Sequence, residues 1–78
     1  MYLKMSDLKK GESGIIKSLS NASDMRRRLI DIGFSEGALV TLLCHAPLSD
    51  PSAYNVKGSI IALRRQDACL ITVEKENR

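Results

Sequence analysis

The sequence predicts a small, mainly β protein in which about five short strands curl into a partly closed barrel, with one short α-helix packed at an end. Three observations support this fold class. Short apolar runs separated by turn residues recur along the 78-residue chain. Only one segment has a helical period. A flat sheet of this size would leave apolar surface exposed, whereas a curled sheet encloses one core and reduces its exposed edges.

Five segments are predicted as strands because their apolar side chains tend to recur at every second position. They are residues 14–19, 38–45, 53–56, 59–63 and 70–73. Before the first of them, residues 6–11 are expected to form a capped turn that closes at a glycine. In segment 38–45, the alternation places Cys44 with the core and His45 on the outer face.

One helix is predicted, over residues 24–32. Met25, Leu29 and Ile32 are spaced i, i+4 and i+7, so they form one apolar stripe that faces the sheet. Gly33 follows at the position where a glycine commonly ends a helix. Such a short helix is not stable alone in water, so it must pack on the barrel.

Composition and charge limit the classes of protein to which the chain can belong. The chain has 12 Lys and Arg residues against 9 Asp and Glu residues, a net charge of +3, and two cysteines. We expect a single domain over residues 1–78, with its core at about 8–74 and a frayed charged tail at 75–78. No apolar run is long enough to cross a membrane, and no signal peptide is apparent, which predicts a cytoplasmic protein with reduced thiols.

Catalysis is not expected, and neither is a bound cofactor. The five glycines are dispersed, so they form no glycine-rich phosphate loop. His45 is the single histidine, and no serine, cysteine or acidic residue stands beside it in the spacing of a known triad. The carboxylates are scattered through turns and termini, where caps and solvated charges are typical.

A metal site within one chain is not expected either. Cys44 and His45 are adjacent, but neighbouring side chains on a strand point to opposite faces, so they reach one ion only if the strand bulges. The sequence contains no Cys-x-x-Cys pair and no spaced His pair. A metal-sensing module with Cys44, His45 or Cys69 as ligands, or a site shared between chains, stays open as an alternative.

Nucleic-acid binding is a weaker alternative, and no nucleic-acid partner is expected. The basic clusters are the arginines at 26–28 and 64–65. Three consecutive helical residues spread around a helix, and Asp24 and Asp31 are close enough along it to pair with them. The chain has only three aromatic residues, too few for the stacking platform on which small barrels bind single strands.

What remains is a surface for a protein partner. On a helical wheel Ile30 lies off the apolar stripe and near Arg26, which predicts an exposed docking pair. Two prolines stiffen the loop 46–52, and Leu48 there has no strand face to join. We therefore expect Arg26, Ile30, Leu48 and Asp50 to contact a partner. A scattered surface residue and a proline-fixed connection are the plainer interpretations. A homo-oligomer through strand edges is left open.

Short motifs along the chain make it similar to a known family. They are Leu8-Lys9-Lys10-Gly11, Arg28-Leu29-Ile30-Asp31-Ile32-Gly33-Phe34 followed by Gly37, Ala46-Pro47-Leu48-Ser49-Asp50-Pro51, Gly58, and Ile61-Ala62-Leu63-Arg64 followed by Ala68, Ile71 and Val73. The set covers residues 8–74 and resembles the FeoA family, small cytoplasmic proteins of bacterial ferrous-iron uptake. Each motif alone is weakly specific, whereas the ordered set is fairly specific. Ser49 departs from the glycine that many members carry.

The resemblance implies an SH3-like barrel with no enzymatic activity of its own. It implies work with the FeoB membrane transporter, whose cytoplasmic part binds and hydrolyses GTP, so contact with the membrane would come only through that transporter. Similar domains occur in metal-dependent transcription repressors. The function expected is a cytosolic accessory protein that binds the GTP-binding part of FeoB and modulates its activity or assembly. The alternative is a metal-responsive module.

Overall fold

The computed structural model describes residues 1–20, 23–45 and 50–76, and in them one antiparallel sheet of six strands. In chain order the elements are β1 (Tyr2–Lys4), the 3-10 helix η1 (Met5–Asp7), β2 (Ser13–Leu19), α1 (Ser23–Asp31), β3 (Leu39–His45), β4 (Ser52–Val56), β5 (Ser59–Leu63), α2 (Arg65–Ala68) and β6 (Ile71–Lys75). The strand order across the sheet is β1-β6-β2-β3-β4-β5. This mainly β architecture confirms the predicted fold class, and all five predicted strands are present with bounds within two residues.

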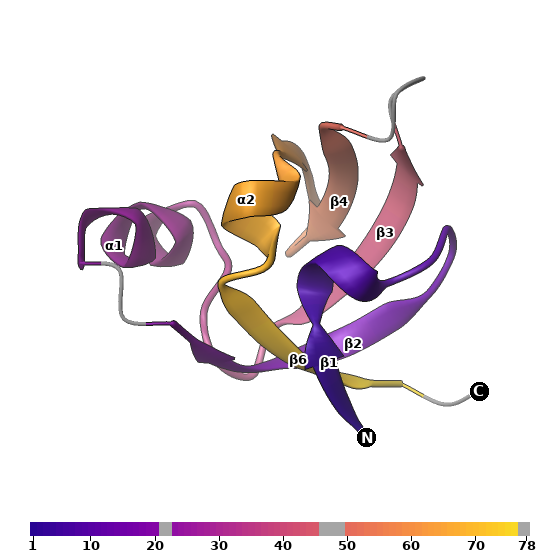
Figure 1. The fold of residues 1–78 in the computed structure, drawn as a ribbon, viewed down its shortest axis with the longest axis horizontal. Helices are drawn as coiled ribbons and strands as arrows, with labels where there is room; N and C mark the ends of the chain where they lie inside the picture. The colour runs from indigo at the N-terminus through magenta and orange to yellow at the C-terminus, as the bar shows by residue number, and fades with distance from the viewer. Residues whose placement is uncertain (21–22, 46–49, 77–78) are drawn as a thin grey trace.

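Contact between two short helices connects the two edge strands of the sheet, β1 and β5. β1 leads into η1 and β5 leads into α2, and these two helices contact each other. Figure 1 shows the bent sheet with η1 and α2 side by side and α1 set apart at one end, next to the end of β2. The curl therefore brings the N-terminal segment opposite strands that are distant in the sequence.

The core is filled by aliphatic side chains from the inward positions of the strands and by one aromatic pair. The rings of Phe34 and Tyr54 meet edge to face, with centroids 6.5 Å apart and an interplanar angle of 88°. Gly14 lets β2 approach β6 closely, since a Cβ there would lie 3.0 Å from the Cβ of Val73. The largest fully buried side chains are Tyr54, Phe34, Met5, Ile16, Leu29, Leu42, Ile71, Val40, Val56 and Val73.

The end of α1 is a Schellman motif centred on Gly33, which has a φ of 121°. The Gly33 N–H donates to the Ile30 carbonyl over 3.1 Å, and the Phe34 N–H donates to the Leu29 carbonyl over 2.8 Å. Leu29 and Phe34 are both fully buried, which supplies the apolar contact that commonly accompanies this motif. The predicted glycine cap is confirmed.

The buried face of α1 differs from the predicted stripe. Leu29 is 1% exposed, and Met25 and Ile30 pack against the core, but Ile32 is 46% exposed. The prediction is thus wrong for Ile32, and the expected exposure of Ile30 is also wrong. The helical wheel treats every residue as helical, whereas Ile32 follows the last residue of α1 and lies in the turn that Gly33 redirects.

A β-bulge changes the faces at the end of β3. The register of β3 against β4 shifts between Leu42 and Cys44. Beyond the shift, Cys44 is exposed, while His45 pairs with Ser52 and lines a pocket. The predicted core position of Cys44 is wrong, because one extra residue in a strand inverts the alternation that follows it. His45 is exposed, as predicted.

Two elements, β1 and α2, are not among those predicted from the sequence. β1 pairs with β6, where Leu3 lies opposite Val73. Residues 65–67 belong to a segment predicted as a polar turn, but they begin α2. Elements of three and four residues are too short to carry a recognisable period, and tertiary contacts decide whether they form.

Candidate functional site

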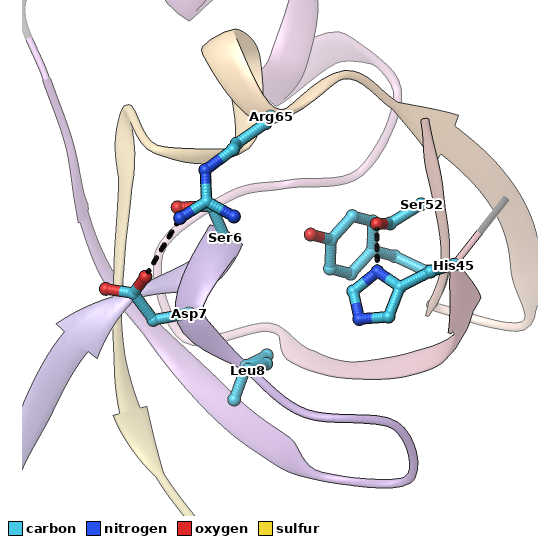
Figure 2. Close-up of a pocket in the computed structure, with 7 residues that line it drawn as sticks. Ser6, Asp7, Leu8, His45, Ser52 and Arg65 are labelled. Carbon is cyan, nitrogen blue, oxygen red and sulfur yellow. Dashed lines mark hydrogen bonds and ion pairs between the residues drawn. The ribbon is translucent and has the colours of Figure 1, made fainter. Parts of the chain in front are cut away.

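An open pocket of about 260 Å³ lies where η1 faces the ends of β3, β4 and α2. Two polar pairs stand on its opposite sides, His45 with Ser52 and Asp7 with Arg65, as Figure 2 shows. The pocket exists only in the folded barrel, because four elements contribute to it. Its lining residues are Ser6, Asp7, Leu8, His45, Ser52, Tyr54 and Arg65.

One side of the pocket carries three polar side chains, those of His45, Ser52 and Tyr54. The Nδ1 atom of His45 lies 2.7 Å from the Oγ atom of Ser52. Ser52 and Tyr54 are 7% and 1% exposed. The bulge in β3 makes the His45–Ser52 contact possible, because it places His45 opposite Ser52. In Figure 2 the second ring nitrogen of His45 is on the side of the ring away from Ser52.

The hydroxyl of Tyr54 remains protonated across the physiological pH range. Burial raises the pKa of Tyr54 above its ordinary value, and the negative charge of Asp50 adds a smaller contribution in the same direction. The polar side chain of Ser52 and the positive charge of Arg65 act in the opposite direction. Since the pKa of a free tyrosine is already about 10, Tyr54 is available as a hydrogen-bond donor.

The other side of the pocket is an exposed ion pair. Nη2 of Arg65 lies 3.7 Å from Oδ1 of Asp7, and the two side chains are 68% and 51% exposed. An exposed pair at this separation contributes little to stability, so Arg65 can exchange its partner at small cost. Leu8 adds an apolar wall between the two polar sides, and it is 2% exposed.

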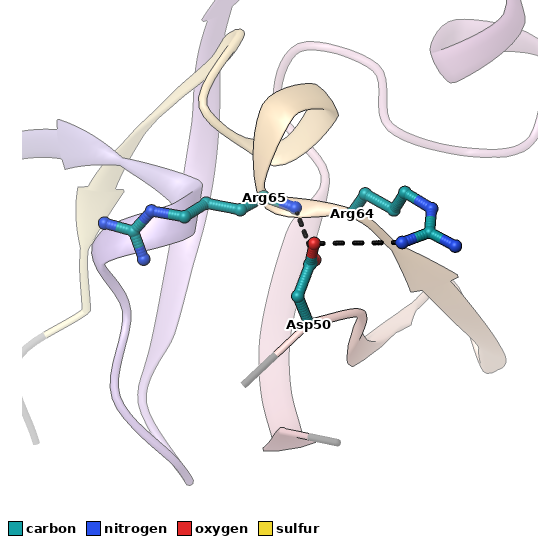
Figure 3. A network of polar contacts seen from close by, with 3 residues as sticks. All are labelled: Asp50, Arg64 and Arg65. Carbon is teal, nitrogen blue, oxygen red and sulfur yellow. Dashed lines mark hydrogen bonds and ion pairs between the residues drawn. The ribbon is translucent and has the colours of Figure 1, made fainter. Parts of the chain in front are cut away.

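Asp50 fixes the start of α2 beside this pocket. One carboxylate oxygen accepts the backbone N–H of Arg65 over 2.8 Å, and the other lies 3.9 Å from Nη1 of Arg64. Figure 3 shows the two arginine side chains leaving this carboxylate in opposite directions. Asp50 therefore ties the segment before β4 to α2 and leaves the Arg65 guanidinium free to reach the pocket.

Three of the four predicted contact residues lie in the part of the chain that the structure describes. Arg26 is exposed on α1, and Asp50 is exposed beside α2. Ile30 packs partly against the core, and Leu48 lies outside the described residues. Sequence reasoning missed the pocket because its residues come from distant segments, and the isolated His45 was the only local signal for it.

The arginines of α1 are solvated. Residues 26, 27 and 28 are all exposed. Within the part of the chain that the structure describes, neither Asp24 nor Asp31 forms an ion pair with them, so the predicted pairing along the helix is wrong. The basic residues that do form ion pairs there are Lys17, Arg64, Arg65 and Lys75.

The predicted metal ligands are dispersed. Cys44 is an exposed free thiol, and Cys69 is a partly buried one whose Sγ donates to the Gln66 carbonyl over 3.2 Å. In residues 1–20, 23–45 and 50–76, no three His, Cys, Asp or Glu side chains gather where they could hold a metal ion. Over the same ranges, no helix combines the length and apolar character needed to span a membrane.

Residues 3–75 match the family model described as the FeoA domain. The chain belongs to this family. A curated relative of this FeoA chain is the Fe(2+) transport protein A/Fe(2+) transporter FeoB fusion protein of Porphyromonas gingivalis (strain ATCC BAA-308 / W83). It is 33% identical over 72 residues, which are 92% of the chain, and the chain spans 8% of that relative's length.

Solved structures agree with this assignment. The FeoA protein from Chlorobium tepidum is 38% identical, with a TM-score of 0.87 over 94% of this chain and 70% of that one. Stenotrophomonas maltophilia FeoA, solved with zinc and described as a procaryotic SH3 domain protein, is 26% identical, with a TM-score of 0.81 over 95% of this chain and 89% of that one. The predicted SH3-like fold is confirmed.

Proposed function

We propose that this FeoA protein is an accessory protein of ferrous-iron uptake that binds the GTP-binding cytoplasmic part of an FeoB-type transporter and modulates its activity or assembly. The observation that carries the proposal is the Porphyromonas gingivalis relative, whose name joins transport protein A and FeoB in a single fusion protein. Fusion keeps two modules at a high effective concentration, which favours an interaction that separate chains make by diffusion.

A module without chemistry of its own can act on the transporter only through unequal affinity for two of its conformations. A difference of about 1–3 kcal/mol between the two binding free energies is typical of such coupling. It would shift the transporter's conformational equilibrium by about 5- to 150-fold. The proposal therefore requires tighter binding to one nucleotide state of the transporter than to the other.

The proposed contact surface keeps most of the residues predicted from the sequence. Arg26 is exposed on α1, Asp50 is exposed beside α2, and Leu48 stays a prediction. Ile30 offers a partner only part of its side chain, because the rest packs against the core. Ile32, in the turn just after the same helix and 46% exposed, is the better apolar contact.

Calorimetric titration of the purified chain with the transporter's cytoplasmic part, loaded with GDP or with a GTP analogue, tests the proposal. We expect binding that differs between the two nucleotides. Arg26→Glu should weaken binding by about tenfold, because attraction between Arg26 and an acidic group of the transporter becomes repulsion. Lys10→Glu, in the turn after η1, makes the same charge change away from α1 and should have little effect. If the wild-type chain binds neither form, the proposed function is rejected, and equal effects of the two variants remove α1 from the contact surface.

A metal-responsive module is the second candidate, and the zinc in Stenotrophomonas maltophilia FeoA favours it. Because the candidate ligands are dispersed over the described residues, a site in this chain would have to be shared between copies. Native mass spectrometry during a zinc titration should then show a metal-bound dimer that Cys44→Ser abolishes. A monomer that takes up no zinc would reject this candidate.

A further inference from the structure

We propose that the pocket between the His45–Ser52 and Asp7–Arg65 pairs binds one carboxylate, presented by an Asp or Glu side chain of a partner protein. The inference rests on the proposed function only for the source of that carboxylate, which would be the transporter's cytoplasmic part. The chemistry of the pocket is argued from its own residues.

The His45–Ser52 pair has one hydrogen more than its single hydrogen bond uses. If Ser52 donates to Nδ1 of His45, the remaining hydrogen is on Nε2 of His45. If Nδ1–H instead donates to Ser52, the hydroxyl hydrogen of Ser52 remains. Both directions leave one donor on a residue that lines the pocket.

The facing side supplies a positive charge and a further hydroxyl. Arg65 lines the pocket, and among the described residues its guanidinium forms one long, exposed ion pair, with Asp7. A carboxylate in the pocket can replace Asp7 as its partner and gain a charge-assisted hydrogen bond. Ser6, 9% exposed, also lines the pocket and brings a hydroxyl to the same space. Donors thus line both sides of the pocket.

Charge and shape favour a single carboxylate over a more highly charged anion. Arg65 and Asp7 carry opposite charges at the same rim, so a dianionic phosphate would be attracted by one and repelled by the other. A monoanion meets a smaller repulsion and still fills the donors. Leu8 lines the same space, and its apolar surface suits the methylene groups that carry an Asp or Glu carboxylate.

Titration of the ¹⁵N-labelled chain with N-acetylglutamate N-methylamide, followed by NMR, tests the pocket in the absence of any transporter. We expect saturable chemical-shift changes at His45, Ser52 and Arg65. N-acetylglutamine N-methylamide, which has the same shape without the charge, should cause no saturable change. Inorganic phosphate should bind no more tightly than the glutamate amide. No saturable change with glutamate, equal binding of the glutamine amide, or tighter binding of phosphate would overturn the proposal.

Three variants test which charged side chains strengthen or weaken glutamate binding. Arg65→Gln should weaken glutamate binding by about fivefold, and Asp7→Asn, which removes the competing carboxylate, should strengthen it by about twofold to fivefold. Arg64→Gln removes the same charge one residue away, outside the pocket, and should change the affinity by less than about twofold. If Arg64→Gln weakens binding as much as Arg65→Gln, or if Asp7→Asn weakens it, the pocket is not the site. Since no transporter is present, failure of the proposed function leaves these outcomes unchanged.

Discussion

Replacing Leu29 by alanine should destabilise the fold far more than replacing Ile32, although both side chains lie on one stripe of the helical wheel. Leu29 is 1% exposed and belongs to the core, whereas Ile32 is 46% exposed. Alanine is the best helix former, so Leu29→Ala does not weaken α1 through intrinsic propensity, and Ile32 lies in the turn just after α1. The difference between the two variants therefore measures the packing of the side chains alone.

The expected magnitude follows from the burial of Leu29. Leucine-to-alanine substitutions in a core cost about 2–5 kcal/mol, because apolar surface is lost and a cavity remains. A 78-residue domain has a total stability of about 4–12 kcal/mol. Leu29→Ala should therefore remove a large part of it and lower the Tm by about 8 °C or more. Ile32→Ala should cost less than about 1 kcal/mol.

Urea and thermal unfolding followed by far-UV circular dichroism measure both variants against the wild-type chain. A lower urea midpoint with an unchanged m-value would show that stability has changed and the unfolded state has not. If Ile32→Ala lowers the free energy of unfolding as much as Leu29→Ala does, Ile32 is packed as tightly as Leu29 and the burial described for the two residues is wrong. A small cost for both would mean that α1 contributes little to the core.

Three further results are expected. Gly14→Ala should destabilise by about 1–3 kcal/mol in urea unfolding, because the new methyl would lie 3.0 Å from Val73; an unchanged midpoint would contradict this. A hydrogen bond from a lysine of β6, and then one from a backbone N–H, lower the pKa of Glu12, so its contribution to stability is present above its ordinary pKa and is lost as the pH falls. The stability difference between wild type and Glu12→Gln should accordingly shrink below about pH 4, and a constant difference would refute that linkage. Cys44 should be alkylated several-fold faster than Cys69 in mass-spectrometric mapping, because it is the more exposed thiol, and the reverse order would contradict the bulge.

The strands and the helix were predictable because their signals are local. Alternating apolar residues and the separating turns locate the strands, and the glycine after α1 ends that helix through hydrogen bonds within six residues. The candidate site was far less predictable. Arg26 and Asp50 are exposed as a contact requires, whereas Ile30 packs partly against the core and offers a partner only part of its side chain.

Sequence alone thus determined a mainly β domain, its one longer helix and the absence of an evident catalytic motif, since short-range period and composition carry that information. Tertiary structure decided which face of α1 is buried, where β3 bulges, and that η1 meets β4 and α2 around a pocket. These features depend on the register between strands and on the curl of the whole sheet. Pairings between distant residues set both, and no local pattern in the chain encodes them.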